Sequence, residues 1–144
     1  MNVVTILKQK GTQVTTVSTV TTLLDASRKL AAKRIGAVIV SDGEGRVQGI
    51  LSERDIVRAI AQGGADILSA PVSDIMTRDV VTCLEDASLD DVMHTMTRGR
   101  FRHVPVVDAK GRLAGIISIG DAVKYQIGEI KLEAEAMKEY IARH

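Results

Sequence analysis

The sequence has few of the residues that carry the more recognisable kinds of chemistry. Only 2% of its 144 residues are aromatic and there is no tryptophan, so the 45% of hydrophobic residues must form a core mainly of Val, Ile, Leu, Ala and Met. The shortage of aromatic rings also counts against a single-stranded nucleic-acid binder, which stacks bases on such side chains. The 19 basic and 18 acidic residues leave a net charge of +1, which gives no reason to expect a polyanion-binding surface.

The single cysteine, Cys83, excludes an intramolecular disulfide and leaves no cysteine pattern for a zinc site. Residues 1–13 are polar and mixed, without the basic start and apolar stretch of a signal peptide. No apolar run approaches the roughly 20 residues that a bilayer-spanning helix needs. We therefore expect a soluble cytoplasmic domain that enters no membrane.

Catalytic groups are equally scarce. With three histidines and one cysteine, no nucleophile–base pair, metal cluster or glycine-rich phosphate loop can be assembled at a suitable spacing. His94 is expected to be a solvated helix residue, and Cys83 a small buried thiol rather than a nucleophile. The sequence predicts no enzyme and no metal site.

What the sequence does contain is a duplication. Shifted by 66 positions, residues 14–57 align with residues 80–123 without a gap. Identical pairs include Gly49 with Gly115, Ser52 with Ser118, and Asp55 with Asp121. Each copy should be one supersecondary unit, and a unit this short needs its twin to bury enough surface.

Periodicity predicts the order β-α-β-β-α in each copy. Thr- and Val-rich stretches read as strands, apolar residues at helical spacing read as helices, and Gly36 is expected to stop the first helix. The elements expected are strands 15–20, 37–40 and 47–52 with helices 23–35 and 53–63, then strands 80–84, 104–107 and 113–118 with helices 89–98 and 121–128. The fold class is therefore α/β, with two repeats packed about a pseudo-twofold axis and an extra C-terminal helix.

Domain boundaries follow from the duplication. The first repeat is placed at residues 8–66, a connection at 67–75, the second repeat at 76–128 and the extra helix at 129–144. In that helix Ile130, Ala134, Met137 and Ile141 share one face. The face either packs back on its own domain or contacts a second chain, and the sequence leaves both open.

The best functional candidate is the element Gly-apolar-apolar-Ser-x-x-Asp at 49–55 and 115–121, where a buried strand meets a helix. A helix N-terminus favours an anion, a Ser hydroxyl can donate to phosphate, and an Asp can accept from the two vicinal hydroxyls of a ribose. The competing interpretation is that Ser and Asp only cap the helix.

At these residues the chain resembles a tandem pair of CBS domains, the module named after cystathionine β-synthase. The resemblance is carried by Arg-Phe-Arg-His-Val-Pro-Val-Val-Asp at 100–108 and Gly-Ile-Ile-Ser-Ile-Gly-Asp at 115–121, with Ser-Glu-Arg-Asp-Ile-Val at 52–57 in the first copy. It covers about residues 14–126.

The resemblance implies a regulatory module that binds adenine nucleotides in two clefts between the repeats and signals to an unidentified partner by a conformational shift. AMP is the first expectation, with ATP, ADP or NAD as alternatives, and no catalytic cofactor. It also implies a homodimer. The alternative is a dimerisation scaffold whose clefts no longer bind nucleotide.

The same resemblance suggests roles for thirteen residues. Asp55 and Asp121 would hold ribose, with Ser52 and Ser118 near ribose or phosphate. Adenine would lie against the backbone of Ile35, Gly36 and Ala37 in one cleft and of Phe101, Arg102 and His103 in the other. Thr15 and Val81, at the first strand of each copy, would form the other side.

Base and ribose sides of one cleft would come from different repeats. Arg54 is expected to contact phosphate in the cleft of Asp55, and Arg102 and His103 to reach phosphate in the cleft of Asp121. Because the first copy has Gly36 where the second has Arg102, the clefts should differ in affinity, with the cleft of Asp121 the tighter.

Overall fold

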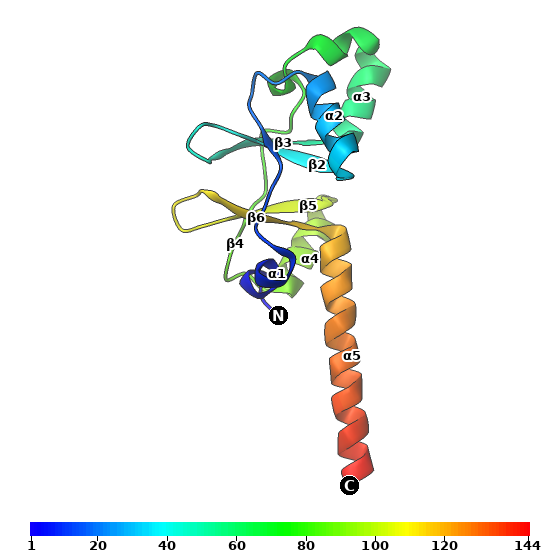
Figure 1. Ribbon diagram of the computed structural model, residues 1–144. Helices are drawn as coiled ribbons and strands as arrows, with labels where there is room; N and C mark the ends of the chain where they lie inside the picture. The colour runs from blue at the N-terminus through cyan, green and yellow to red at the C-terminus, as the bar shows by residue number, and fades with distance from the viewer.

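The computed structural model describes all 144 residues, folded as two similar halves that lie one above the other in Figure 1. The elements of the first half are β1 (Thr16–Val17), α2 (Leu23–Lys33), β2 (Ala37–Ser41), β3 (Val47–Ser52) and α3 (Glu53–Gly63). Those of the second half are β4 (Cys83–Leu84), α4 (Leu89–Gly99), β5 (His103–Val107), β6 (Leu113–Ser118) and α5 (Ile119–Arg143). Helix α1 (Val3–Lys10) precedes the first half, and the short 3₁₀ helices η1 (Ala65–Ser69) and η2 (Val72–Asp74) precede the second.

Each half contains a three-stranded sheet of the same topology. The orders are β1-β2-β3 and β4-β5-β6, with the first pair of strands parallel and the second antiparallel. Val38 pairs with Leu51, and 66 positions later Val104 pairs with Ile117; all four side chains are fully buried. The expected β-α-β-β-α order and the α/β fold class are confirmed.

The two halves have separate hydrophobic cores built, as the composition requires, almost wholly from aliphatic residues. The core of the first half gathers side chains from its sheet, α2 and α3 with Val72 and Met76 of the connection. The core of the second half includes Val3, Ile6 and Leu7 of α1.

The segment that leads into each half therefore packs on the other half. In α1 the Val3 amide donates to the Ala87 carbonyl at 2.8 Å, and in the connection the Val72 amide donates to the Thr21 carbonyl at 2.7 Å. In Figure 1 α1, in dark blue, lies beside the lower half. Lys8 to Lys10, grouped above with the first repeat, form the last turn of this helix.

Some predicted element ends are wrong. Helix α2 ends at Lys33 with Arg34 in the left-handed region at φ 53°, and α4 ends with its equivalent Arg100 at φ 57°. Gly36 is thus not the helix stop, because a non-glycine residue adopts the terminating conformation two positions earlier. The first strand of each half has only two residues, since just Thr16–Val17 and Cys83–Leu84 pair with the neighbouring strand.

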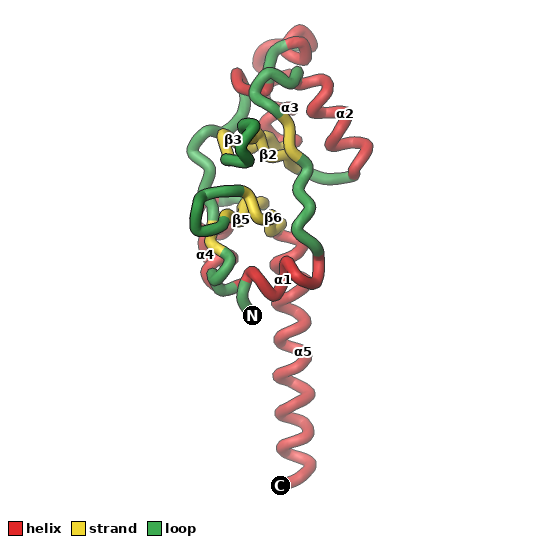
Figure 2. Tube along the Cα trace, turned by 60° about the vertical axis from the view of Figure 1, so that its left-hand side comes forward, coloured by secondary structure: helices red, strands yellow, loops and turns green.

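The last helix of the second half and the C-terminal helix form one continuous element, α5, of 25 residues. Ala122 and Tyr125 in its first turns are buried, whereas every residue from Ile130 onward is exposed. Figures 1 and 2 show its later turns projecting away from both halves, so this segment does not pack back on its own domain. No helix of the chain is both long and apolar enough to span a bilayer.

Candidate functional site

Both Ser-x-x-Asp junctions form the same closed hydrogen-bond arrangement at a helix start. The Asp55 amide donates to Ser52 Oγ at 3.2 Å, while the Ser52 amide donates to Asp55 Oδ2 at 2.9 Å. Asp121 and Ser118 repeat these bonds at 3.1 and 2.9 Å. These capping boxes satisfy amides that a helix start would leave unpaired, so the capping interpretation is correct for both junctions.

The capping hydrogen bonds involve only one oxygen of each aspartate carboxylate. Asp55 Oδ2 accepts from the Ser52 amide and from Ser52 Oγ at 3.0 Å, but Asp55 Oδ1 accepts no hydrogen bond from the protein. The same is true of Asp121 Oδ1. One oxygen of each aspartate therefore has no hydrogen-bond donor within the protein.

A cavity of about 250 Å³ opens at Asp55 between the two halves. The first half contributes residues around the end of β3 and the start of α3, and the second half contributes the chain between α4 and β5. The lining residues are Gly36, Ile50, Ser52, Glu53, Arg54, Asp55, Arg58, Thr77, Arg100, Phe101, Arg102 and His103. Seven of the thirteen predicted site residues lie together here, and they come from both repeats.

The cavity has an excess of positive charge. Four arginines line it, Arg54, Arg58, Arg100 and Arg102, against the two carboxylates of Glu53 and Asp55. Such an arrangement attracts an anion and suits the planar, multidentate hydrogen bonding of guanidinium groups to phosphate.

Glycine at position 36 allows the two halves to approach closely. A Cβ on Gly36 would lie 3.4 Å from Glu53 Oε1 and 3.4 Å from His103 Cε1. Burial lowers the pKa of His103; the charges of Arg102 and Lys10 add to this, and Glu53 and Asp121 partly oppose it. The imidazole is therefore neutral at pH 7 and able to accept or donate one hydrogen bond.

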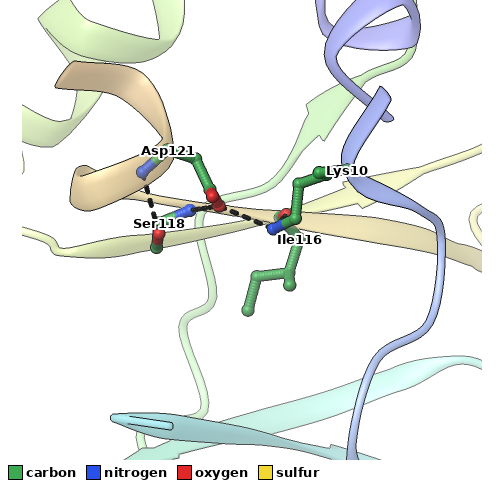
Figure 3. Close-up of polar contacts among 4 residues, drawn as sticks. All are labelled: Lys10, Ile116, Ser118 and Asp121. Carbon is green, nitrogen blue, oxygen red and sulfur yellow. Dashed lines mark hydrogen bonds and ion pairs between the residues drawn. The ribbon is translucent and has the colours of Figure 1, made fainter. Parts of the chain in front are cut away.

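The Asp121 junction differs because Lys10 lies against it (Figure 3). Lys10 Nζ is 2.6 Å from Asp121 Oδ2 and donates to the Ile116 carbonyl at 2.7 Å. Burial raises the pKa of the Asp121 carboxyl, but the hydrogen bonds from Lys10 and Ser118 outweigh it, and the pKa lies below its ordinary value. Asp121 is thus an ionised carboxylate already paired with a cation.

The other predicted site residues lie apart from the Asp55 cavity. Thr15 and Ile35 line a separate hollow with Gln13, Val14 and Lys33. Ala37 is buried in the sheet, whereas Val81 is 40% exposed.

Sequence reasoning missed several residues that the structure brings to these sites. Arg100 could have been found, since it belongs to the same short basic stretch as Arg102 and His103. Arg58 lies one helical turn after Arg54, a spacing that places both on one face of α3. Lys10 gave no signal, because it lies outside the duplicated register.

Residues set aside as non-functional offer no second site. Burial raises the pKa of the Cys83 thiol to about 11, which keeps it protonated and unreactive. His94 is exposed on α4, and no group of three or more His, Cys, Asp or Glu side chains could hold a metal ion.

Comparison with known proteins gives a match to the same family in both halves of the chain. A family model described as the CBS domain matches residues 11–62 and 72–128. An uncharacterized 17.7 kDa protein of Acidianus ambivalens is 36% identical over 103 residues, which are 72% of this chain and 61% of that protein. The chain spans between 23% and 61% of the length of four curated relatives that it matches.

Solved structures match over nearly the whole of both chains. A CBS-domain containing protein from Agrobacterium tumefaciens is 49% identical, with a TM-score of 0.82 over 87% of this chain and 98% of that one. A CBS domain protein from Pyrobaculum aerophilum complexed with AMP is 28% identical, with a TM-score of 0.75 over 84% and 89%. The CBS domain pair of protein MJ0100, in complex with 5'-methylthioadenosine and S-adenosyl-L-methionine, is 29% identical, with a TM-score of 0.80 over 90% and 98%.

The two family matches coincide with the two halves of the chain, and the solved structures share its overall fold. None of the names above is that of an enzyme. With a domain match in each half, it belongs to the CBS-domain family as a tandem pair.

Proposed function

We propose that this chain is a regulatory module that binds an adenine nucleotide in the cavity of Asp55 and signals to a partner protein through the relative position of its two repeats. The observation that carries the proposal is the meeting, in one cavity, of a free carboxylate oxygen and four arginines drawn from both halves. A ligand held by both halves binds one relative arrangement better than another, which is the requirement for a conformational signal.

The residues suggest how the nucleotide would bind. Asp55 Oδ1 would accept from the ribose hydroxyls, and Phe101 to His103 would flank the base. Arg54 and Arg58 on α3 lie on the same wall as Asp55 and would hold phosphate.

The charge of the cavity favours a phosphate-bearing ligand. An excess of two positive charges, four arginines less two carboxylates, complements AMP, the ligand in the structure of the Pyrobaculum aerophilum relative. It opposes the sulfonium of S-adenosyl-L-methionine, which is bound in the MJ0100 domain pair. A volume of about 250 Å³ lies just below the roughly 300–1,000 Å³ of most small-molecule sites, which favours a mononucleotide over NAD.

We place the stronger site at Asp55, the reverse of the order expected from sequence. The reason is Lys10, whose ammonium group already neutralises Asp121 and would have to move before a ribose could bind there.

Isothermal titration calorimetry tests the proposal. AMP should bind, adenosine should bind more weakly, and S-adenosyl-L-methionine should bind least. Asp55→Ala should weaken AMP at least about tenfold, roughly the 1.4 kcal/mol of a charge-assisted hydrogen bond. Asp121→Ala, the matched change at the equivalent capping box, should leave this binding event within about twofold.

The role of phosphate is tested separately with Arg54→Ala, which should weaken AMP much more than adenosine. Equal losses for the two ligands would remove that role. If no adenine ligand binds the folded wild-type protein, the scaffold alternative holds, in which Ser52 and Asp55 serve only as the observed cap.

A further inference from the structure

The exposed half of α5 has no partner within the chain. From Ile130 every residue is exposed, and the ion pair of the Met1 amino group with Glu129 at 2.6 Å marks where the helix leaves the second half. The remaining 14 residues extend about 20 Å at 1.5 Å per residue. Helices of about 12–15 residues are marginal alone in water, so this extension needs a partner surface.

We propose that α5 pairs in parallel and in register with α5 of a second copy of this chain, forming a short two-stranded coiled coil. The apolar residues of α5 follow an alternating spacing of four and three, which is the heptad pattern of such a seam. The seam residues are Val123, Ile127, Ile130, Ala134, Met137 and Ile141. All of them except Ala134 have large side chains, and these are 45–67% exposed. Nothing else in the chain covers this row of apolar side chains.

The charges beside the seam favour a second copy of the chain as the partner of α5, and a parallel direction of the two helices. Lys124, Lys131 and Lys138 flank it on one side, and Gln126, Glu133 and Tyr140 on the other. In a parallel pair each Glu133 would face Lys138 of the other copy, giving two ion pairs related by the twofold axis. An antiparallel pair would bring the lysine-lined edges together, which is repulsive. The helix is therefore complementary to itself in the parallel direction.

Two exposed hydrophobic residues allow a matched test. Ile130 lies on the seam and Leu132 lies on the opposite side of the helix, and they are 54% and 66% exposed. Sedimentation equilibrium of the full chain should show a dimer whose dissociation constant rises at least about tenfold in Ile130→Glu and stays within about twofold in Leu132→Glu. Equal behaviour of the two variants, a monomeric wild type or a larger assembly would overturn the proposal. Circular dichroism verifies that both variants remain folded.

Direction is tested by disulfide formation in a Cys83→Ser background. Ile127→Cys and Ile141→Cys, at opposite ends of the seam, should each cross-link to the same residue of a second copy at least about tenfold faster than Glu135→Cys, which points outward. An antiparallel pair would instead cross-link a mixture of the two variants, and that result would refute the parallel arrangement. Since no nucleotide enters either experiment, the outcome is independent of the function proposed above.

Discussion

At the scale of single residues, Lys10 distinguishes the two otherwise similar Ser-x-x-Asp junctions. Its ammonium group and Asp121 are both largely shielded, with side-chain exposures of 24% and 22%. The 66-residue shift relates Lys10 to Met76, so nothing equivalent neutralises Asp55. One side chain outside the duplication thus makes the two halves chemically unequal.

Replacing Lys10 should open the second cleft. In Lys10→Met the carboxylate of Asp121 loses its cation, and we expect AMP titrations to show a second binding event absent from the wild type. The partly exposed ion pair should cost about 1 kcal/mol of unfolding free energy when lost. Lys8→Met, on the same helix without a side-chain partner, is the control. An unchanged stoichiometry in Lys10→Met would show that Lys10 does not block the cleft.

His103 should make stability depend on pH. Burial lowers its pKa, so the unfolded state binds a proton more readily than the folded state. Stability from this residue is fully present above the unfolded pKa of about 6.5 and is lost as the pH falls below it. Urea denaturation should therefore show a smaller loss of unfolding free energy between about pH 7.5 and about pH 5.5 in His103→Gln than in the wild type. An equal loss in both proteins would contradict the assignment.

At the scale of elements, α1 and the connection between the halves make equivalent contacts with the two sheets, although their sequences are unrelated. Leu7 of α1 crosses the second sheet at Gly115, and Met76 of the connection crosses the first sheet at Gly49. A Cβ on either glycine would lie 2.6 Å from the crossing side chain, so only glycine permits these approaches. The glycines are among the identical pairs of the duplication because both crossings need them.

Gly49→Ala should therefore destabilise the protein. The added Cβ would also meet the Thr77 carbonyl oxygen at 3.0 Å, which is backbone and cannot rotate away. We expect a loss of about 1–3 kcal/mol of unfolding free energy in chemical denaturation, the usual cost of overpacking. Gly43→Ala is the control, since its Cβ would meet nothing within 4 Å. Similar stability of the two variants would argue against the crossing.

At the scale of the whole molecule, α1 precedes the first repeat but packs in the core of the second, and this joins the two repeats into one folding unit. The second core depends on Val3, Ile6 and Leu7, which are at most 3% exposed. They belong to α1, which lies far along the chain from α4 and α5, the helices of the second repeat. The second repeat is therefore not complete as a continuous stretch of chain, whereas the first core is formed within residues 17–76.

Removing residues 1–11 should accordingly unfold the second half first. Each of the three buried aliphatic side chains contributes about 1.5–3 kcal/mol, which together rivals the total stability of a small domain. Hydrogen exchange should show early loss of protection in β5 and β6, while β2 and β3 keep theirs. Uniform protection in the shortened chain would mean that α1 is dispensable.

The strands and turns of the fold could be predicted from the sequence, because they depend on residues close along the chain and the duplication shows them twice. Identical spacing of Asp42 and Asp108, Gly49 and Gly115 predicts the same strands and turns twice. Helix ends were less predictable, since Arg34 adopts a conformation that its residue type disfavours. The site was predicted in part: Asp55 and Phe101 were identified separately, and the pairing of the halves brings them together.

The sequence by itself determined the repeat, the α/β class and the Ser-x-x-Asp junctions, because these depend on periodicity and on contacts close along the chain. Tertiary structure alone decided that α1 completes the second core, that Lys10 pairs with Asp121, and that the arginines converge on Asp55. Lys10 and Asp121 are 111 residues apart. Such contacts follow from how two cores close against each other, which no local pattern encodes.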